Sequence, residues 1–75
     1  MPKLRRVSGR EAIRALERLG FAQIRQRGSH IVLKKLTSEG EIGCVVPLHI
    51  ELAIGTLRGV LKQARVTPEE FMENL

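Results

Sequence analysis

FAQIRQRGSHIVLKKLTSEGEIGCVV, residues 21–46, contains the pattern from which the fold of this chain can be predicted. Apolar and polar residues alternate along it with the two-residue period of half-buried strands. The pattern predicts three strands, over residues 21–27, 29–35 and 42–46. Turns are expected at Gly28 and at residues 37–40, where small and polar residues gather. Because both connections are short, the strands are expected to form an antiparallel meander.

The same alternation predicts which side chains share a face of the sheet. The face beneath the helices is expected to carry the apolar side chains of Ala22, Ile24, Ile31, Leu33, Ile42, Cys44 and Val46. The opposite, solvent-exposed face is expected to carry Gln23, Arg25, Arg27, His30, Val32 and Lys34. A single imidazole would then stand among several cations.

A helix is predicted before the strands, over residues 8–19. It begins with a capping-box sequence, Ser8-Gly9-Arg10-Glu11, and repeats apolar residues at helical spacing. Gly20 is expected to adopt the left-handed C-terminal cap and to bring Phe21 back onto Leu16 in a Schellman arrangement.

Two further helices are predicted after the strands. Leu57, Val60, Leu61 and Ala64 mark an amphipathic helix, on which Gly59 is expected to permit a close approach of backbone. Thr67-Pro68-Glu69-Glu70 combines a cap, a proline at the first helical position and a second capping-box spacing, so a short last helix is expected.

These elements predict a single domain over residues 1–75, in the order α-β-β-β-α with a short C-terminal helix. Such an order is typical of an α+β two-layer fold, with helices on one face of a three-stranded antiparallel sheet. Cys44 is the one cysteine, and its place in an apolar run favours a buried thiol that packs as a small hydrophobe over a nucleophile. Stability must therefore come from packing or from a partner protein.

Charge is distributed unevenly along the chain. Residues 1–35 carry a net charge of +8 and residues 36–75 a net charge of −3, within a total of +5. A basic half-chain favours a polyanionic partner such as nucleic acid, although a merely solvated surface has the same composition. Phe21 and Phe71 are the only aromatic residues, which argues against a base-stacking platform.

The location expected from the sequence is the cytoplasm. No apolar stretch approaches the ~20 residues that a membrane span requires, and the basic N-terminus does not lead into a signal-peptide core.

His30 is the candidate catalytic residue. RNA is cleaved without a metal when a base takes the proton of the ribose 2′-hydroxyl, an acid protonates the leaving oxygen, and cations stabilise the charged phosphorane. An imidazole can serve as base or acid, and Arg25, Arg27 and Lys34 are the expected phosphate contacts. His49 is a possible second acid or base; its alternative role is that of a loop residue hydrogen-bonded to backbone.

No metal site and no small-molecule cofactor are expected. The acidic residues are scattered over helices and loops, and no histidine or cysteine pair has the spacing of metal ligands. The sequence also lacks a phosphate-binding glycine loop and a serine-nucleophile elbow.

The chain resembles HicA (YcfA-like) toxins of HicA-HicB toxin-antitoxin pairs along nearly its whole length. The matching pieces are Ser8-Gly9, Leu16-Glu17-Arg18-Leu19-Gly20-Phe21, Gly28-Ser29-His30, Pro47-Leu48-His49, Gly55-Thr56-Leu57 and Leu61-Lys62-Gln63-Ala64. The resemblance implies a double-stranded-RNA-binding-domain-like fold, endoribonuclease activity on messenger RNA and a HicB-like antitoxin that covers the active face. It also implies that His30 is catalytic, and we expect Ser29 beside it to contact the RNA.

The sequence departs from the family pattern in two places. Leu48 stands where many members have a basic residue, which removes one expected phosphate contact. Residues 50–54 are unusually apolar, and are expected to pack either on the antitoxin or on the protein's own core. A non-catalytic RNA-binding module of the same fold, and a small interaction or DNA-binding adaptor, are the alternative functions.

Overall fold

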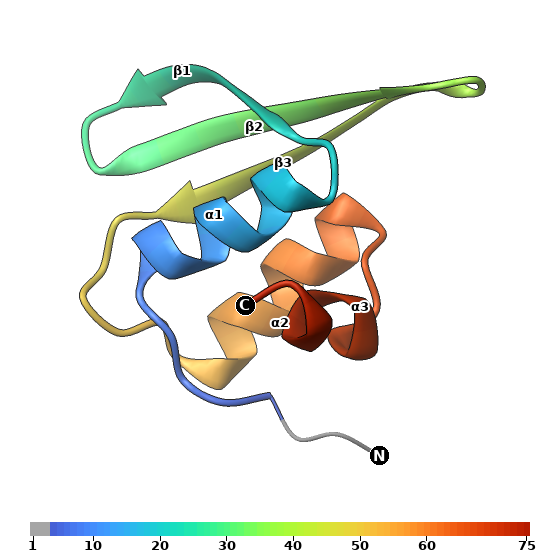
Figure 1. The fold of residues 1–75 in the computed structure, drawn as a ribbon. Coiled ribbons are helices and arrows are strands. Elements are labelled where there is room, and N and C mark those ends of the chain that lie inside the picture. Colours follow the sequence, from blue (N-terminus) through green and yellow to red (C-terminus); the bar gives the residue numbers. More distant parts are fainter. Residues whose placement is uncertain (1–3) are drawn as a thin grey trace.

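The computed structural model describes residues 4–75 as two layers, a three-stranded sheet and a layer of helices that covers one of its faces (Figure 1). Residues 1–3, which include Lys3 of the basic N-terminus, lie outside the described residues. The elements are α1 (Gly9–Arg18), β1 (Ala22–Arg27), β2 (His30–Thr37), β3 (Gly40–Pro47), α2 (Ile54–Ala64) and α3 (Pro68–Glu73). The strands pair antiparallel in the order β1-β2-β3. The predicted α+β order is confirmed, and it is compatible with the double-stranded-RNA-binding-domain-like fold.

Both ends of α1 have the predicted caps. The Ser8 hydroxyl accepts the Glu11 N–H at 3.0 Å, and the Glu11 carboxylate accepts the Ser8 N–H at 2.9 Å. At the other end Gly20 has a φ of +101°, and the Phe21 N–H donates to the Leu16 carbonyl at 3.0 Å. These bonds form the Schellman motif expected after Leu19 and turn the chain directly into β1.

A bulge in β1 inverts part of the predicted face assignment. The pairing with β2 runs Ala22↔Lys34 and Gln23↔Leu33, then skips Ile24 and resumes at Arg25↔Val32. Because one inserted residue shifts the alternation, residues before the bulge point to the faces opposite to those predicted. Gln23 therefore shares the helix-covered face with Leu33, and Ala22 shares the open face with Lys34. Ile24, predicted to lie in the core, is 51% exposed.

Strands β2 and β3 are longer than predicted. Their ladder continues to Thr37↔Gly40, so the four-residue turn expected at residues 37–40 shrinks to Ser38 and Glu39. The Thr37 hydroxyl donates to the Gly40 carbonyl at 2.8 Å, and Gly40 has a φ of +126°. The hairpin thus extends past the helical layer, as Figure 1 shows, and leaves Leu36 79% exposed.

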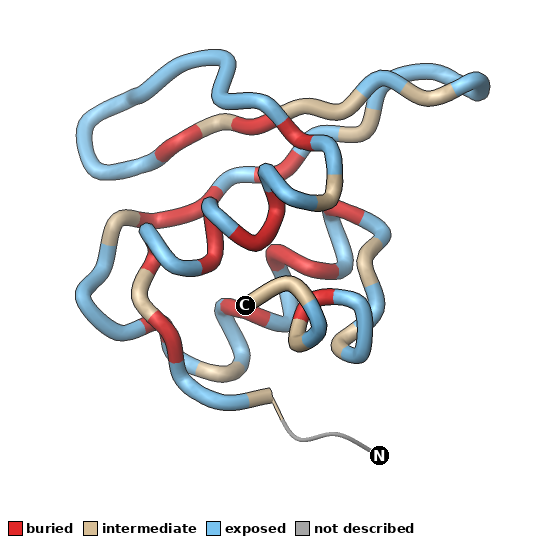
Figure 2. Tube along the Cα trace, viewed as in Figure 1, coloured by how far each residue is buried: buried red, intermediate tan, exposed pale blue. Residues whose placement is uncertain are grey.

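The core lies between the sheet and the helices (Figure 2). Ile31 and Leu33 of β2 and Cys44 and Val46 of β3 face it, as the alternation predicted. The helices contribute Ala12, Ile13, Ala15, Leu16, Leu57, Val60, Leu61, Ala64 and Phe71. Burial raises the pKa of the Cys44 thiol to about 11, so this thiol is a packing group.

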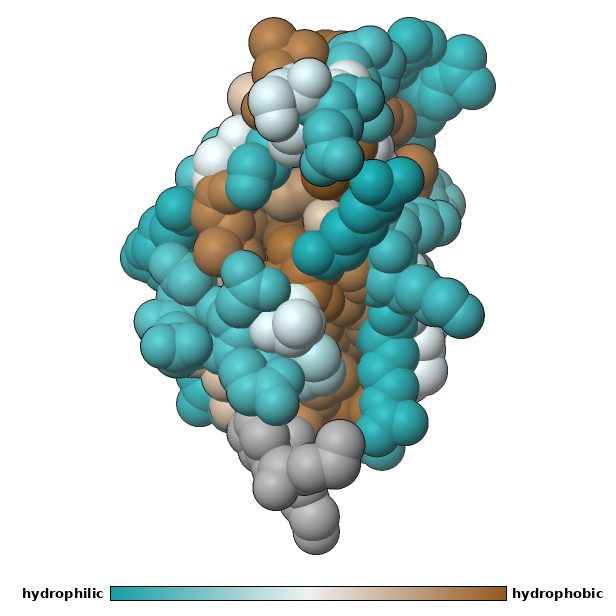
Figure 3. Space-filling model, turned by 90° about the vertical axis from the view of Figure 1, so that its right-hand side faces the viewer, coloured by the Kyte–Doolittle hydropathy of each residue, from teal (hydrophilic) through white to brown (hydrophobic). Residues whose placement is uncertain are grey.

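Some apolar side chains at the margin of the core are only partly covered. They are Leu4, Leu19, Ile42, Leu48, Val66, Met72 and Leu75. Figure 3 shows one face of the molecule on which apolar side chains remain visible between hydrophilic ones.

The segment between β3 and α2 divides its apolar residues between core and solvent. Leu52 is fully buried, and its N–H donates to the Val7 carbonyl at 2.7 Å, whereas Ile50 is 94% exposed. Packing on the protein's own core is thus confirmed for Leu52 and wrong for Ile50.

The close backbone approach expected at Gly59 occurs at Gly9 instead. Gly59 is exposed, and an added Cβ there would meet nothing within 4 Å. Gly9 is buried, and its Cβ would collide with the carbonyl oxygen of Pro47. The Gly9 N–H also donates to the His49 carbonyl at 2.9 Å. The start of α1 is therefore docked directly on the chain that leaves β3.

Candidate functional site

The open face of the sheet carries the predicted cations and the imidazole in ordered rows. Residues directly opposite each other in a ladder point to the same face. One row is Arg27, His30 and Pro47, the next is Arg25, Val32 and Val45, and the third is Ala22, Lys34 and Gly43. The register therefore makes Arg27 the cross-strand neighbour of His30 and sets Arg25 one row further along.

Five of these residues line a shallow, open groove of about 500 Å³: Arg25, Arg27, His30, Val32 and Val45. Val32 and Val45, paired across β2 and β3, give it an apolar part, and Val45 is 39% exposed. The two arginines and the histidine supply its polar part. A groove with an apolar floor and cationic sides suits a ligand that combines flat apolar rings with negative charge.

The backbone around His30 is fixed on both sides. Gly28, with a φ of +57°, takes the first central position of the two-residue turn between β1 and β2, as a type II′ turn requires. The Gln26 carboxamide donates to the Gly28 carbonyl at 2.8 Å, and the Leu48 N–H donates to the Ser29 carbonyl at 2.7 Å. The imidazole therefore projects to solvent from a well-tied turn at the first residue of β2.

The three predicted phosphate contacts differ in their surroundings. Arg25 and Arg27 are exposed and form no ion pair within residues 4–75. Lys34 lies outside the groove, is partly buried, and pairs with Glu41 at 3.8 Å. The two arginines are therefore freer to hold a phosphate than Lys34 is.

His49 and Ser29 border the site through their backbone. Both side chains are exposed, and neither residue lines the groove. The carbonyl of His49 accepts the Gly9 N–H, and the carbonyl of Ser29 accepts the Leu48 N–H. Each thus ties the chain near the end of β3 to a neighbouring element.

Some residues that form or support the site could not be identified from the sequence. Val32 and Val45 looked like ordinary strand positions, and only the register shows that they form the groove's apolar part. Gln26 and Leu48 support the Gly28-Ser29 turn by hydrogen bonds that no sequence pattern predicts. The nearest signal was the Pro47-Leu48-His49 motif, which the resemblance had marked without a structural reason.

In the part of the chain that the structure describes, no three His, Cys, Asp or Glu side chains gather closely enough to hold a metal ion. None of the helices within residues 4–75 is both long and apolar enough to cross a membrane.

The fold and its open face define a small α+β domain with a basic, histidine-bearing sheet surface. Residues 9–66 match the family described as the HicA toxin of bacterial toxin-antitoxin, and the chain belongs to this family. Its role is that of the toxin in a toxin-antitoxin pair, and an antitoxin is its partner. A search among curated proteins gives no match.

Proposed function

We propose that this toxin is an endoribonuclease that cleaves messenger RNA without a metal ion, with His30 as general acid or base. The observation that supports this most directly is the row that pairs the exposed His30 with Arg27 on the open sheet face. Arg25 extends the same positive surface along the groove. An acid-base group is thereby set beside the cations that a phosphate needs.

In the proposed reaction the ribose 2′-oxygen attacks the adjacent phosphorus, and the bond from phosphorus to the 5′-oxygen breaks. The products are a 2′,3′-cyclic phosphate and a 5′-hydroxyl end. His30 either takes the proton of the 2′-hydroxyl or donates one to the leaving 5′-oxygen, and water completes the other transfer. Arg27 and Arg25 stabilise the additional negative charge of the phosphorane.

The groove suits a single strand of RNA. Bases and riboses can rest on Val32 and Val45, while the phosphates meet the two arginines. Ser29 and Lys34 lie at the margins of this path, where their polar groups contact the flanking backbone. No cofactor takes part in the proposed reaction.

The partner is proposed to be an acidic, HicB-like antitoxin that covers the same face. Carboxylates opposite Arg25 and Arg27 would compete directly with phosphates, and charge complementarity would speed the association. Val32, Val45 and the exposed Ile24 supply apolar surface that such a partner can bury.

The test is cleavage of a uniformly labelled messenger RNA in the presence of EDTA by the wild type and by His30→Ala and His49→Ala variants. We expect the wild type to cut, leaving cyclic phosphate ends, and His30→Ala to be inactive. Wild-type protein that binds the RNA and never cuts it would establish the non-catalytic RNA-binding module instead. Failure of His49→Ala to cut as well would assign His49 the second proton transfer.

A further inference from the structure

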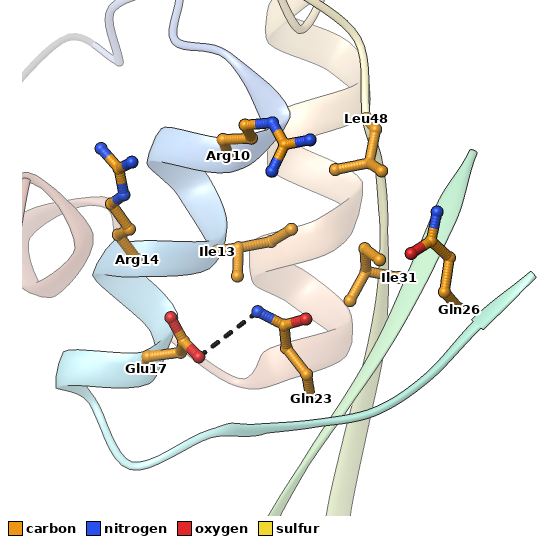
Figure 4. Close-up of a pocket in the computed structure, with 8 residues that line it drawn as sticks. All are labelled: Arg10, Ile13, Arg14, Glu17, Gln23, Gln26, Ile31 and Leu48. Atoms are coloured by element: carbon orange, nitrogen blue, oxygen red, sulfur yellow. Dashed lines mark hydrogen bonds between the residues drawn. The ribbon is translucent and has the colours of Figure 1, made fainter.

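A second concavity lies on the helix-covered side of the β1-β2 hairpin, between α1 and β1 (Figure 4). Its volume is about 190 Å³, and it is lined by Arg10, Ile13, Arg14, Glu17, Gln23, Gln26, Ile31 and Leu48. Ile13, Ile31 and Leu48 are its apolar residues, and the remainder are charged or carboxamide side chains. We call this concavity the α1-β1 pocket.

The polar side chains of the α1-β1 pocket are partly engaged and partly free. Gln23 donates its amide N–H to the Glu17 carboxylate at 3.4 Å, and Gln26 donates to the Gly28 carbonyl at 2.8 Å. These bonds hold both carboxamides in place and leave their oxygens available as acceptors. Figure 4 shows Arg10 reaching over the pocket toward Leu48, and Arg10 has no ion-pair partner among residues 4–75.

The bulge in β1 is what brings Gln23 to this pocket. In an unbroken strand Gln23 would share the open face with Arg25; the skipped Ile24 turns it toward α1. The pocket therefore exists because of an irregularity in the strand that carries the proposed phosphate contacts.

The α1-β1 pocket lies on the helix-covered face of the β1-β2 hairpin, and the groove beside His30 lies on its open face. Gln26 pairs with Ile31 on the helix-covered face, and the next pair, Arg27 and His30, stands on the open face. Strand β1 is one of the two edge strands of the sheet and is exposed along its whole length. An RNA strand bound beside His30 can pass over this edge, or around the Gly28-Ser29 turn, and reach the pocket within a short run of nucleotides.

We propose that the α1-β1 pocket binds one base of the RNA strand next to the cleavage site and so determines sequence preference; this rests on the proposed ribonuclease function. A planar guanidinium and fixed carboxamides match the donor and acceptor edge of a base, and the apolar residues pack against its ring. At ~30 Å³ for each water molecule the pocket has room for roughly six waters, and one ring system entering it would displace them. A protein interface needs roughly 800 Å² on each side and a core depleted in charge, so RNA is the occupant that the pocket favours.

The first test is cleavage of an RNA pool randomised around one cut site. Gln23→Ala and Arg10→Ala are compared with the wild type and with Arg58→Ala, which removes an arginine from an exposed position of α2 outside both concavities. We expect Gln23→Ala and Arg10→Ala to lower the discrimination among bases at one flanking position by about tenfold, because a good pair of hydrogen bonds to a base contributes roughly that factor. Arg58→Ala should keep the wild-type preference. Unchanged preferences in both pocket variants would overturn the proposal.

A second test does not depend on cleavage. Short RNA oligonucleotides are titrated into the His30→Ala protein while the side-chain amide signals of Gln23 and Gln26 are followed by NMR. Shifts that saturate with some oligonucleotide sequences and not with others support the base site even if the wild type proves unable to cut RNA. If the side-chain amides of Gln23 and Gln26 stay unperturbed while the backbone amides of β2 respond, the RNA does not enter the pocket. Pocket variants that bind antitoxin more weakly and cut with the wild-type preference would assign the pocket to the protein partner.

Discussion

His30 and Arg27 are direct cross-strand neighbours on the open face of the sheet, joined through the two-residue turn Gly28-Ser29. Because a two-residue turn sets the register of a hairpin, the distance between these side chains does not depend on distant parts of the fold. A change in the length of this turn would move the imidazole to the other face or away from the arginine. The short turn is therefore a geometric requirement of the proposed site.

His30→Ala should abolish RNA cleavage and leave both the fold and the affinity for uncut RNA nearly unchanged. General acid-base catalysis contributes ~10² to 10⁴ in rate, and an exposed side chain adds little to stability. Single-turnover cleavage, filter binding and thermal unfolding measure the three quantities. An unfolded variant would show that the imidazole has a structural role.

Arg25→Ala and Arg27→Ala should each weaken RNA binding and reduce its dependence on salt. The slope of log affinity against log salt concentration is expected to fall by about 0.7 for each phosphate of single-stranded RNA that the variant no longer neutralises. Lys34→Ala should change the slope less, since its ammonium already pairs with Glu41. Binding titrations at several salt concentrations measure these slopes, with Arg58→Ala as the matched removal of one positive charge. Equal slopes for all of these variants would place the RNA elsewhere.

Gly9→Ala and Gly59→Ala should have opposite effects on stability, although both replace a glycine in a helix. The Gly9 variant forces a methyl group into the Pro47 carbonyl, and overpacking of this kind costs about 1–3 kcal/mol. The Gly59 variant meets open space in the interior of α2 and should gain about 0.5–1 kcal/mol from helix propensity. Urea unfolding of both variants checks the signs. A stabilised Gly9→Ala would mean that α1 is not docked on the end of β3.

Acid should destabilise the protein by weakening the capping boxes at the N-termini of α1 and α3. Hydrogen bonds from Ser8 lower the pKa of Glu11, and hydrogen bonds from Thr67 lower the pKa of Glu70, each below the ordinary value of 4.5. A carboxylate with a lowered pKa in the folded state contributes stability that is complete above the unfolded pKa and is lost as the pH falls through the folded one. Stability should therefore decline as the pH falls below 4.5, and less steeply in a Glu11→Gln, Glu70→Gln double variant. NMR titration of the two carboxyl groups measures the pKa values directly.

An acidic HicB-like antitoxin should displace RNA from the toxin. The expected result of titrating antitoxin against toxin bound to a labelled, uncleavable RNA is complete release with one antitoxin chain for each toxin. Both ligands would need the surface around Arg25, Arg27 and His30, so they should exclude each other. A stable ternary complex of toxin, antitoxin and uncut RNA would show inhibition at a distance from His30.

Local signals in the sequence predicted most of the fold. Both capping boxes and the Schellman turn at Gly20 involve residues within a few positions of each other, so their chemistry is complete in the sequence. The core faces of β2 and β3 also followed from alternation, because no bulge interrupts their ladder.

The wrong predictions concern residues whose position depends on contact with another segment of the chain. A bulge is set by the partner strand, so alternation across Ile24 misplaced Ala22, Gln23 and Ile24. The close approach was expected at Gly59 and occurs at Gly9, since only the assembled fold brings the Pro47 carbonyl against α1.

For the site, the positions of Arg25, Arg27 and His30 on the open face were predictable from the sequence. The pairing of Val32 with Val45 and the Lys34-Glu41 ion pair were not, because both depend on the register between strands.

The ties between the chain after β3 and earlier segments also bear on when the toxin matures during its synthesis. The Gly9 N–H donates to the His49 carbonyl, and the Leu48 N–H donates to the Ser29 carbonyl. Neither hydrogen bond can form before the later of its two residues has been synthesised. The β1-β2 hairpin can form from neighbouring residues, whereas docking of α1 must close the long loop to His49. A nascent chain shorter than this point lacks both hydrogen bonds, although Arg27 and His30 can already pair across their short turn. The surface proposed to bind RNA therefore has its full set of supporting hydrogen bonds only after residues 48 and 49 have been synthesised.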